Sequence, residues 1–209
     1  MQIPATLRLR FQLMSAADAN LLFDVDQDEQ VMLYINGGQK SSWQDIEQRM
    51  VPRMNAYHNP QLGYGIYAVF ATQALPSKHS GDPALPEPLS AQHSAADSYL
   101  GWILVRPMNF FTTGAEHDNL ELGWRFKRHC WGLGIASEAA AAVANSVVAQ
   151  RAQLTSITPV QALSAIALPD NQASIGVMKK LGMQYVKRYI HQDPLGDYDV
   201  VLYRKMVAR

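Results

Sequence analysis

The chain has 209 residues, of which 48% are hydrophobic, and this suffices for the core of one domain, or at most one domain with an elaborate loop. Lysine plus arginine and aspartate plus glutamate each number 18, so the formal net charge is zero and nothing electrostatic points to nucleic acid or a membrane surface. The single cysteine excludes an internal disulfide, and the spacing of cysteine and histidine predicts no metal site. The N-terminus has no apolar signal segment and no run approaches the ~18 apolar residues of a membrane span, so we expect a cytoplasmic protein.

The N-terminal part of the chain predicts one strand and two helices. Residues 6–14 alternate apolar and polar side chains, as a half-buried strand does. A helix is expected over residues 15–27, where a serine supplies the N-cap. The Asn-Gly-Gly run at 36–38 is a strong stop, and a second helix should follow over 41–57. Pro52 lies inside that second pattern and should kink or end it.

Two further strands are predicted in the middle of the chain, at residues 65–71 and 99–106, and they should pair as a hairpin. The intervening residues 72–98 hold four of the eleven prolines and show no apolar periodicity. Such a segment buries too little to offset its ordering entropy, so we predict a flexible, proline-rich insertion between the second and third strands. Residues 107–118 are predicted to form another loop.

The most informative stretch is a strand, a turn and the start of a helix over residues 121–139. Residues 121–126 alternate as a strand, and the turn that follows contains Gly132 and Gly134. A helical pattern begins at Ile135. The first turn of a helix has unpaired N–H groups and a favourable dipole for anions, and glycines let phosphates approach the main chain. The stretch therefore predicts a phosphate site, although a tight turn without a ligand has the same outline.

The amino-acid sequence of this turn excludes two common phosphate-binding motifs. A P-loop needs Gly-Lys-Ser/Thr after its glycines, which is absent, and a dinucleotide fingerprint needs a glycine or alanine where Ser137 stands.

Downstream, residues 160–168 are apolar at both odd and even positions and therefore predict a strand buried on both faces. A helix should begin after Asn171 and end at Gly182, and strands are expected around 184–190 and 198–204.

Two segments together resemble a known family. The His-Cys-Trp-Gly-Leu-Gly sequence at 129–134 resembles the acetyl-CoA loop of the GNAT acetyltransferases, Gln/Arg-x-x-Gly-x-Gly/Ala, with His129 at the usual Gln or Arg position. Glu-Leu-Gly-Trp at 121–124 and the Asn-x-x-Ser-x-x-Val segment that starts at Asn171 are similar to the RimJ/RimL-like branch, which acetylates protein N-termini.

This resemblance implies one α/β domain over residues 1–209, with a mixed, twisted sheet of about seven strands and four helices. In that fold the fourth and fifth strands splay apart and the acyl-carrying arm of acetyl-CoA enters between them, bonded to the free edge of the fourth strand. The implied cosubstrate is acetyl-CoA and no metal is expected. The implied partner is an amine acceptor, with no direct nucleic-acid binding and no membrane, and a homodimer is compatible with the family.

The resemblance also implies which residues form the site. The pyrophosphate is expected on the backbone amides of residues 131–136, and the pantetheine arm and thiol near the start of the second signature helix. The expected cofactor contacts are Trp124, Phe126, Arg128, His129, Trp131, Gly132, Leu133, Gly134, Ile135, Ala136, Asn171 and Ser174.

For catalysis, Glu121 is our candidate general base, acting through one water, because it is the only carboxylate on the strand that leads into the turn. The alternatives for Glu121 are a solvated strand residue and a structural partner of Arg125, and Glu116 and Asp118 are rival bases. Ser174 could protonate the leaving thiolate, but a serine in a first helical turn is more often a cap.

Three functions remain open from the sequence. The first is N-acetylation of a protein N-terminus by direct attack of the amine on the thioester. An α-amine with a pKa of ~8 costs ~0.7 kcal/mol to deprotonate at pH 7.5, whereas lysine at ~10.4 costs ~4, so an α-amine asks less of a base. The second is acetylation of a small amine such as an amino acid, a polyamine or an antibiotic. The third is a non-catalytic module that binds acyl-CoA.

Overall fold

One seven-stranded sheet organises the part of the chain that the computed structural model describes, residues 1–75, 95–112, 114–155 and 157–207. The strand order is β1-β2-β3-β4-β5-β7-β6, and every neighbouring pair is antiparallel except β4 and β5. The strands are β1 (Leu9–Leu13), β2 (Gly65–Ala71), β3 (Tyr99–Met108), β4 (Glu116–Phe126), β5 (Ala162–Ala167), β6 (Gln184–Asp193) and β7 (Gly196–Met206).

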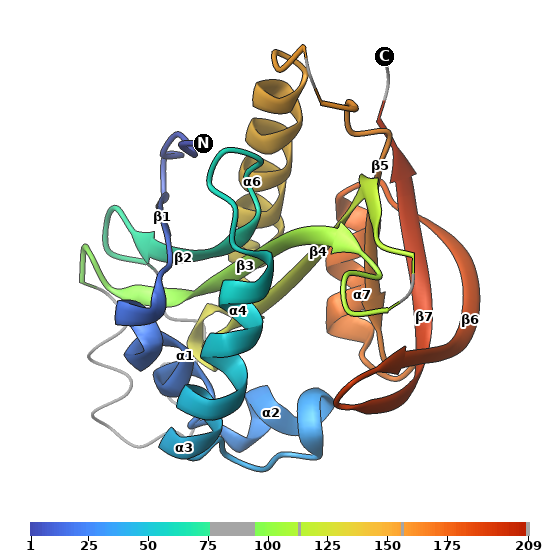
Figure 1. Cartoon of the computed structure of the whole chain (residues 1–209). Helices are drawn as coiled ribbons and strands as arrows, with labels where there is room; N and C mark the ends of the chain where they lie inside the picture. Colours follow the sequence, from blue (N-terminus) through green and yellow to red (C-terminus); the bar gives the residue numbers. More distant parts are fainter. Residues whose placement is uncertain (76–94, 113, 156, 208–209) are drawn as a thin grey trace.

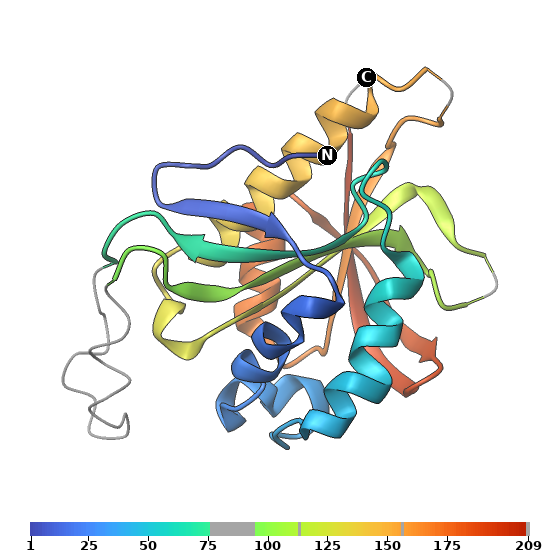
Figure 2. The same cartoon turned by 60° about the vertical axis from the view of Figure 1, so that its left-hand side comes forward.

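Helices cover both faces of this sheet (Figures 1 and 2). The segments on one face are α1 (Ala19–Val25), α2 (Glu29–Asn36), α3 (Trp43–Asp45) and α4 (Val51–Tyr57), and those on the other are α6 (Ile135–Arg151) and α7 (Gln172–Lys180). Each face has its own buried apolar cluster. On α6 the buried stripe has the spacing of four that an α-helix requires, at Ile135, Ala139, Val143 and Val147. The α/β fold class with a mixed, seven-stranded sheet is therefore confirmed.

The N-terminal helical region differs from the prediction of two helices, so the expected total of four is too low. Residues 16–18 form a 3₁₀ turn before α1, and α2 is a separate helix that the sequence patterns do not distinguish. The reason is Asp28, whose side chain accepts from Gln30 N and caps a new helix. The predicted stop is present, because Gly37 ends α2 with a φ of 79°.

Pro52 neither ends nor interrupts the second helical stretch. Residues 46–50 form a π-helical turn between α3 and α4, and Pro52 lies in the first turn of α4. A wider turn accommodates a residue that lacks an N–H and whose ring would clash with the preceding carbonyl.

The hairpin of β2 and β3 is confirmed by their antiparallel pairing. The predicted insertion at 72–98 leaves β2 and returns to β3, but residues 76–94 lie outside the described residues and its flexibility stays a prediction. The loop predicted over 107–118 is shorter, at residues 109–115, because β3 and β4 both extend into it. A register shift between Pro107 and Met108 absorbs the missing proline donor.

The parallel pair β4–β5 separates after a short contact. Only residues 119–121 of β4 pair with 162–164 of β5, although the strands continue to Phe126 and Ala167. Within the described residues, the β5-facing edge of β4 therefore has no strand partner beyond Glu121. This confirms the expected splay of the fourth and fifth strands and leaves a row of backbone groups available at the edge of β4. No helix in the described ranges is long and apolar enough to cross a membrane.

Candidate active site

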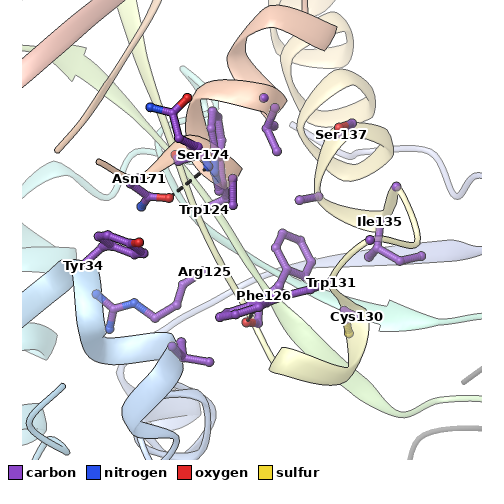
Figure 3. Close-up of a pocket in the computed structure, with 18 of the residues that line it drawn as sticks. Tyr34, Trp124, Arg125, Phe126, Cys130, Trp131, Ile135, Ser137, Asn171 and Ser174 are labelled. Atoms are coloured by element: carbon purple, nitrogen blue, oxygen red, sulfur yellow. Dashed lines mark hydrogen bonds between the residues drawn. The ribbon is translucent and has the colours of Figure 1, made fainter. Parts of the chain in front are cut away.

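A cavity of about 440 Å³ lies next to the separated part of β4 (Figure 3). Its lining comes from four places: the end of β4, the turn that follows with the start of α6, one side of α7 from its N-cap to Lys180, and one side of α2. Because α2 covers one face of the sheet and α7 the other, the cavity spans the edge of β4 and connects both faces. The splay is thus what opens a passage through the sheet.

Most of the expected cofactor contacts meet in this cavity. Its lining includes Trp124, Phe126, Trp131, Gly132, Gly134, Ile135, Ala136, Asn171 and Ser174. The three expected contacts outside the lining are Arg128, His129 and Leu133. Arg128 Nε lies 3.1 Å from an Asp28 oxygen, His129 is buried, and the Leu133 carbonyl accepts from Arg8 Nη1 at 3.0 Å. Of the side chains in this turn, that of Arg128 is therefore paired with α2, whereas Trp131 belongs to the cavity lining.

The two glycines of the turn adopt a conformation that favours glycine. Gly132 has a φ of 74° and Gly134 a φ of 77°, both in the left-handed region. Gly134 is the N-cap of α6, and no side chain from the described residues caps this helix. The first-turn N–H groups of α6 therefore keep their donors for a ligand at the cavity, which fits an anionic phosphate.

The turn is held by its own aromatic and sulfur side chains. Trp131 donates its indole N–H to the Phe126 carbonyl at 3.0 Å, which fixes the ring beside the cavity. Cys130 is buried, and burial raises the pKa of its thiol to about 12, with Lys127 opposing the shift. Burial therefore favours the protonated thiol over the thiolate.

The start of α7 forms another wall of the cavity. The Asn171 side chain caps the helix by accepting from Ser174 N at 3.0 Å, as the dashed line in Figure 3 shows. The alternative that Ser174 is the helix cap is therefore wrong, because Asn171 has that role. Ser174 lies in the third position of the helix, where its hydroxyl adjoins the cavity.

Glu121 is buried, and neither alternative for it is correct. Its exposed fraction is 5%, and both carboxylate oxygens accept from Arg106, at 2.7 Å from Nε and 3.0 Å from Nη2. Arg106 lies directly opposite Glu121 in the β3–β4 ladder, whereas Arg125 is four residues away along the strand, or about 13 Å. Arg125 instead forms a buried ion pair with Asp26. Glu121 is outside the cavity lining and lies at the last β4–β5 pair before the splay.

Aromatic and charged side chains enclose the Glu121–Arg106 pair. The Arg106 guanidinium lies 5.8 Å from the Tyr57 ring and 5.2 Å from the Phe111 ring. Burial lowers the pKa of Arg106, but the charge and hydrogen bonds of Glu121 outweigh this effect and raise it overall. Burial also raises the pKa of Tyr57, with Arg106 opposing and Glu121 adding to the shift. Both partners of the pair are thus shielded from water.

The rival carboxylates occupy different surroundings. Glu116 accepts from Asn109 and Asn119, each at 2.8 Å, and Asn119 in turn accepts from the fully buried Ser164. This network joins β4 to β5 just before the two strands separate. A polar residue inside the apolar run of the predicted fifth strand was a signal for such a network, but the sequence could not name its partners. Asp118 is half-buried, and its carbonyl accepts from Gln161 N.

An ion-pair ladder, also not foreseen, joins the α1–α2 segment to the end of β4. Three acids at alternate positions each meet a cation near the turn, in the pairs Asp24–Lys127, Asp26–Arg125 and Asp28–Arg128. The Asp26–Arg125 rung is the buried one, and Ser41 donates to Asp26 at 2.7 Å. The alternation of aspartates was the visible signal, and the ladder fixes α2 as one wall of the cavity. Among the described residues, no three potential metal ligands gather into a metal site.

The comparisons with known proteins agree with this fold and cavity. The family model of the GNAT acetyltransferase domain matches residues 8–184. The chain therefore belongs to the GNAT acetyltransferase family and is an acyl-CoA-dependent N-acetyltransferase. A search of the curated protein sequences finds no match.

Several solved structures share the fold at low sequence identity. A GNAT acetyltransferase from Bacillus anthracis has a TM-score of 0.64 at 20% identity, with 99% of this chain and 98% of that chain covered. RimL, a ribosomal α-N-protein acetyltransferase in complex with coenzyme A, has a TM-score of 0.64 at 15% identity and the same coverage of both chains. An aminoglycoside acetyltransferase in complex with coenzyme A has a TM-score of 0.61 at 11% identity, with 93% of each chain covered. At these identities the likeness concerns the fold and does not select an acceptor.

Proposed function

We propose that the chain transfers the acetyl group of acetyl-CoA to the α-amine of a protein or peptide N-terminus. Acetyl transfer to an amine follows from the family, and the acceptor class is the proposal. The observation that carries it is the charge of the cavity lining: among the described residues, the charged ones that line it are Arg125 and Lys180, and no carboxylate takes part. A polycationic acceptor such as an aminoglycoside or a polyamine needs acidic groups to bind, whereas a peptide with one α-amine does not.

The α2 side of the cavity supports the same choice. Val31, Tyr34 and Ile35 form an apolar wall there, and Tyr34 and Ile35 are partly exposed, at 38% and 42%. Such a wall fits the first side chains and the extended backbone of a peptide better than it fits a polar sugar. RimL, which shares the fold, acts on a protein α-amine.

For the cosubstrate, we propose that backbone N–H groups within residues 131–136 bind the pyrophosphate, with the exception of the Trp131 N–H, which donates to the Arg128 carbonyl at 3.0 Å. The fit rests on the left-handed glycines and on the uncapped start of α6. The β5-facing edge of β4 then offers hydrogen bonds to the amides of the pantetheine arm, in the way an added strand pairs. When bound, acetyl-CoA supplies the activated acetyl thioester, and the chain holds the reacting groups in line.

We propose Glu121 as the proton acceptor for the amine, through one water, and Ser174 as the donor to the leaving thiolate. The position of Glu121 supports this role, because it forms the last β4–β5 pair, next to the point at which the two strands separate. Its pairing with Arg106 holds the carboxylate in one orientation. Ser174 supports the second role because its hydroxyl is on the cavity and is not used for capping.

The experiment is an amine panel in which acceptor-dependent release of coenzyme A is measured. The acceptor peptides have a free α-amine and an uncharged side chain at the N-terminal residue. We expect their kcat/KM to exceed that for spermidine, an aminoglycoside and free amino acids by about tenfold or more. Matched peptides with a formylated N-terminus are the control and should release none. The highest kcat/KM on a polyamine or aminoglycoside would overturn the acceptor class. Binding of acetyl-CoA without turnover of any amine would favour the non-catalytic module.

A further inference from the structure

Arg8, at the N-terminal side of β1, contacts the glycine turn from outside the cavity. Its Nη1 donates to the Leu133 carbonyl at 3.0 Å, and its Nε donates to Glu138 in the first turn of α6 at 2.7 Å. Thr6 donates to the other Glu138 oxygen at 2.5 Å. Neither Arg8 nor Glu138 lines the cavity. Their contacts therefore hold the turn from behind.

The contact with Leu133 decides where the next N–H group points. The carbonyl of Leu133 and the N–H of Gly134 belong to one peptide unit, and the described chain has no cis peptide bond. In a trans peptide these two groups point in opposite directions. Because Arg8 draws the carbonyl away from the cavity, the Gly134 N–H points towards the side on which Gly134 lines it.

The contact with Glu138 removes a competitor for the same donors. A carboxylate in the first turn of a helix is attracted to the uncapped N–H groups, which are the groups a phosphate would use. Here both Glu138 oxygens are engaged, one by Arg8 and one by Thr6, so the carboxylate is turned away from the donors. Arg8 also balances its charge, since the two side chains form an ion pair.

We propose that Arg8 is a positioning residue for the acetyl-CoA site, which it serves by orienting the Leu133–Gly134 peptide and restraining Glu138. The inference rests on the proposed pyrophosphate site on residues 131–136 and adds which side chain holds its backbone donors in the orientation that binds the ligand. The planar guanidinium makes both contacts at once, which the single ammonium of lysine cannot reproduce with the same geometry.

The test is the affinity for coenzyme A, measured by calorimetry, in Arg8→Met, Arg8→Lys and the double variant Arg8→Met with Glu138→Gln. We expect the dissociation constant to rise about tenfold or more in Arg8→Met and Arg8→Lys, as when a charge-assisted hydrogen bond that orders a site is lost. The double variant keeps the net charge of the wild type and removes the competing carboxylate, so it should recover only part of the loss, and the remainder measures the orientation of the Leu133–Gly134 peptide. Wild-type affinity in either Arg8→Lys or the double variant would overturn the inference.

Two controls separate this loss from damage to the fold. Arg10→Met removes an arginine two residues further on, in β1, whose partner is Asp97, and it should leave the affinity unchanged. S-acetylpantetheine lacks the pyrophosphate, so its binding should be equal in the wild type and in the Arg8 variants. If the Arg8 variants bind coenzyme A with the affinity of the wild type, this inference alone is wrong. If the wild-type protein does not bind coenzyme A, the proposed function is wrong as well.

Discussion

At the scale of single residues, the pair of Glu121 and Arg106 raises the question of whether Glu121 is the general base or a structural ion-pair partner. Replacing Glu121 with glutamine preserves shape and one acceptor but removes basicity. If Glu121 takes the proton of the amine, kcat should fall by ~10²–10⁴-fold, while the affinity for acetyl-CoA is maintained. The deficit should shrink as pH rises, because more of the amine is then already deprotonated. The pH profile of kcat checks this.

A purely structural Glu121 leads to a different pattern. Glu121→Gln would leave Arg106 buried without its counter-ion, so the melting temperature would fall while the pH profile of the folded enzyme kept its shape. Arg106→Met should then mimic that pattern. Glu116→Gln is a matched control, since it likewise removes the charge of a β4 carboxylate that is bonded through both oxygens and lies near an arginine, Arg204 at 3.5 Å. Near-normal kcat at neutral pH in Glu121→Gln would remove this residue from the mechanism.

Gly134 carries a second prediction at this scale. Gly134→Val should abolish measurable binding of acetyl-CoA in a folded protein, because the φ of 77° is unfavourable for a β-branched residue and the turn must rearrange. A steric clash is not the cause, since a Cβ would meet only Arg8 Nη2, at 3.8 Å. Gly182→Val is the matched control, with a φ of 79° at a residue that is not part of the cavity lining. Calorimetry that finds unchanged affinity in Gly134→Val would show the site to be elsewhere.

At the scale of elements, the ion-pair ladder couples α2 to the turn after β4. Arg128 is a predicted phosphate contact but lies against Asp28. Asp28→Asn keeps an N-cap for α2, since asparagine caps as well as aspartate, and removes one negative charge beside the turn. We expect the affinity for acetyl-CoA to rise about two- to fivefold, the scale of one partly exposed ion pair.

The control for this change is Asp199→Asn, which alters the net charge equally in an exposed pair with Arg188 away from the cavity. Titration calorimetry of both variants at two salt concentrations checks the result, because screening should reduce any gain that arises from charge. A lower affinity in Asp28→Asn would mean instead that Asp28 holds Arg128 in place for the ligand.

At the scale of the whole molecule, Arg151 connects the end of α6 to the opposite parts of the fold. Its side chain is 1% exposed and donates to the Tyr64 hydroxyl and to the carbonyls of His117 and Thr158, at 3.0, 3.2 and 2.9 Å. Arg151→Met should lower the free energy of unfolding by roughly 2–4 kcal/mol, since it leaves buried acceptors without donors. Urea denaturation measures this loss. Arg188→Met, at an exposed pair, should change it little.

The sequence by itself determined the strand–turn–helix and the start of α7. Glycines in left-handed conformations, uncapped N–H groups and an asparagine cap are consequences of a few adjacent residues, so local chemistry was enough to find Gly132, Gly134 and Asn171. Alternating and continuous apolar runs likewise located the seven strands, although the patterns predict no element over residues 28–35, where the structure has α2.

Only the tertiary structure decided which side chains meet. Glu121 pairs with Arg106, which is 15 residues away, Asp26 with Arg125 at a separation of 99, and Arg8 with Leu133 at 125. Each partner is set by strand register and by which helix packs on which face, and these depend on contacts summed over the whole sheet. The same holds for the splay of β4 and β5, because a strand's own residues specify its faces but not where its neighbour departs.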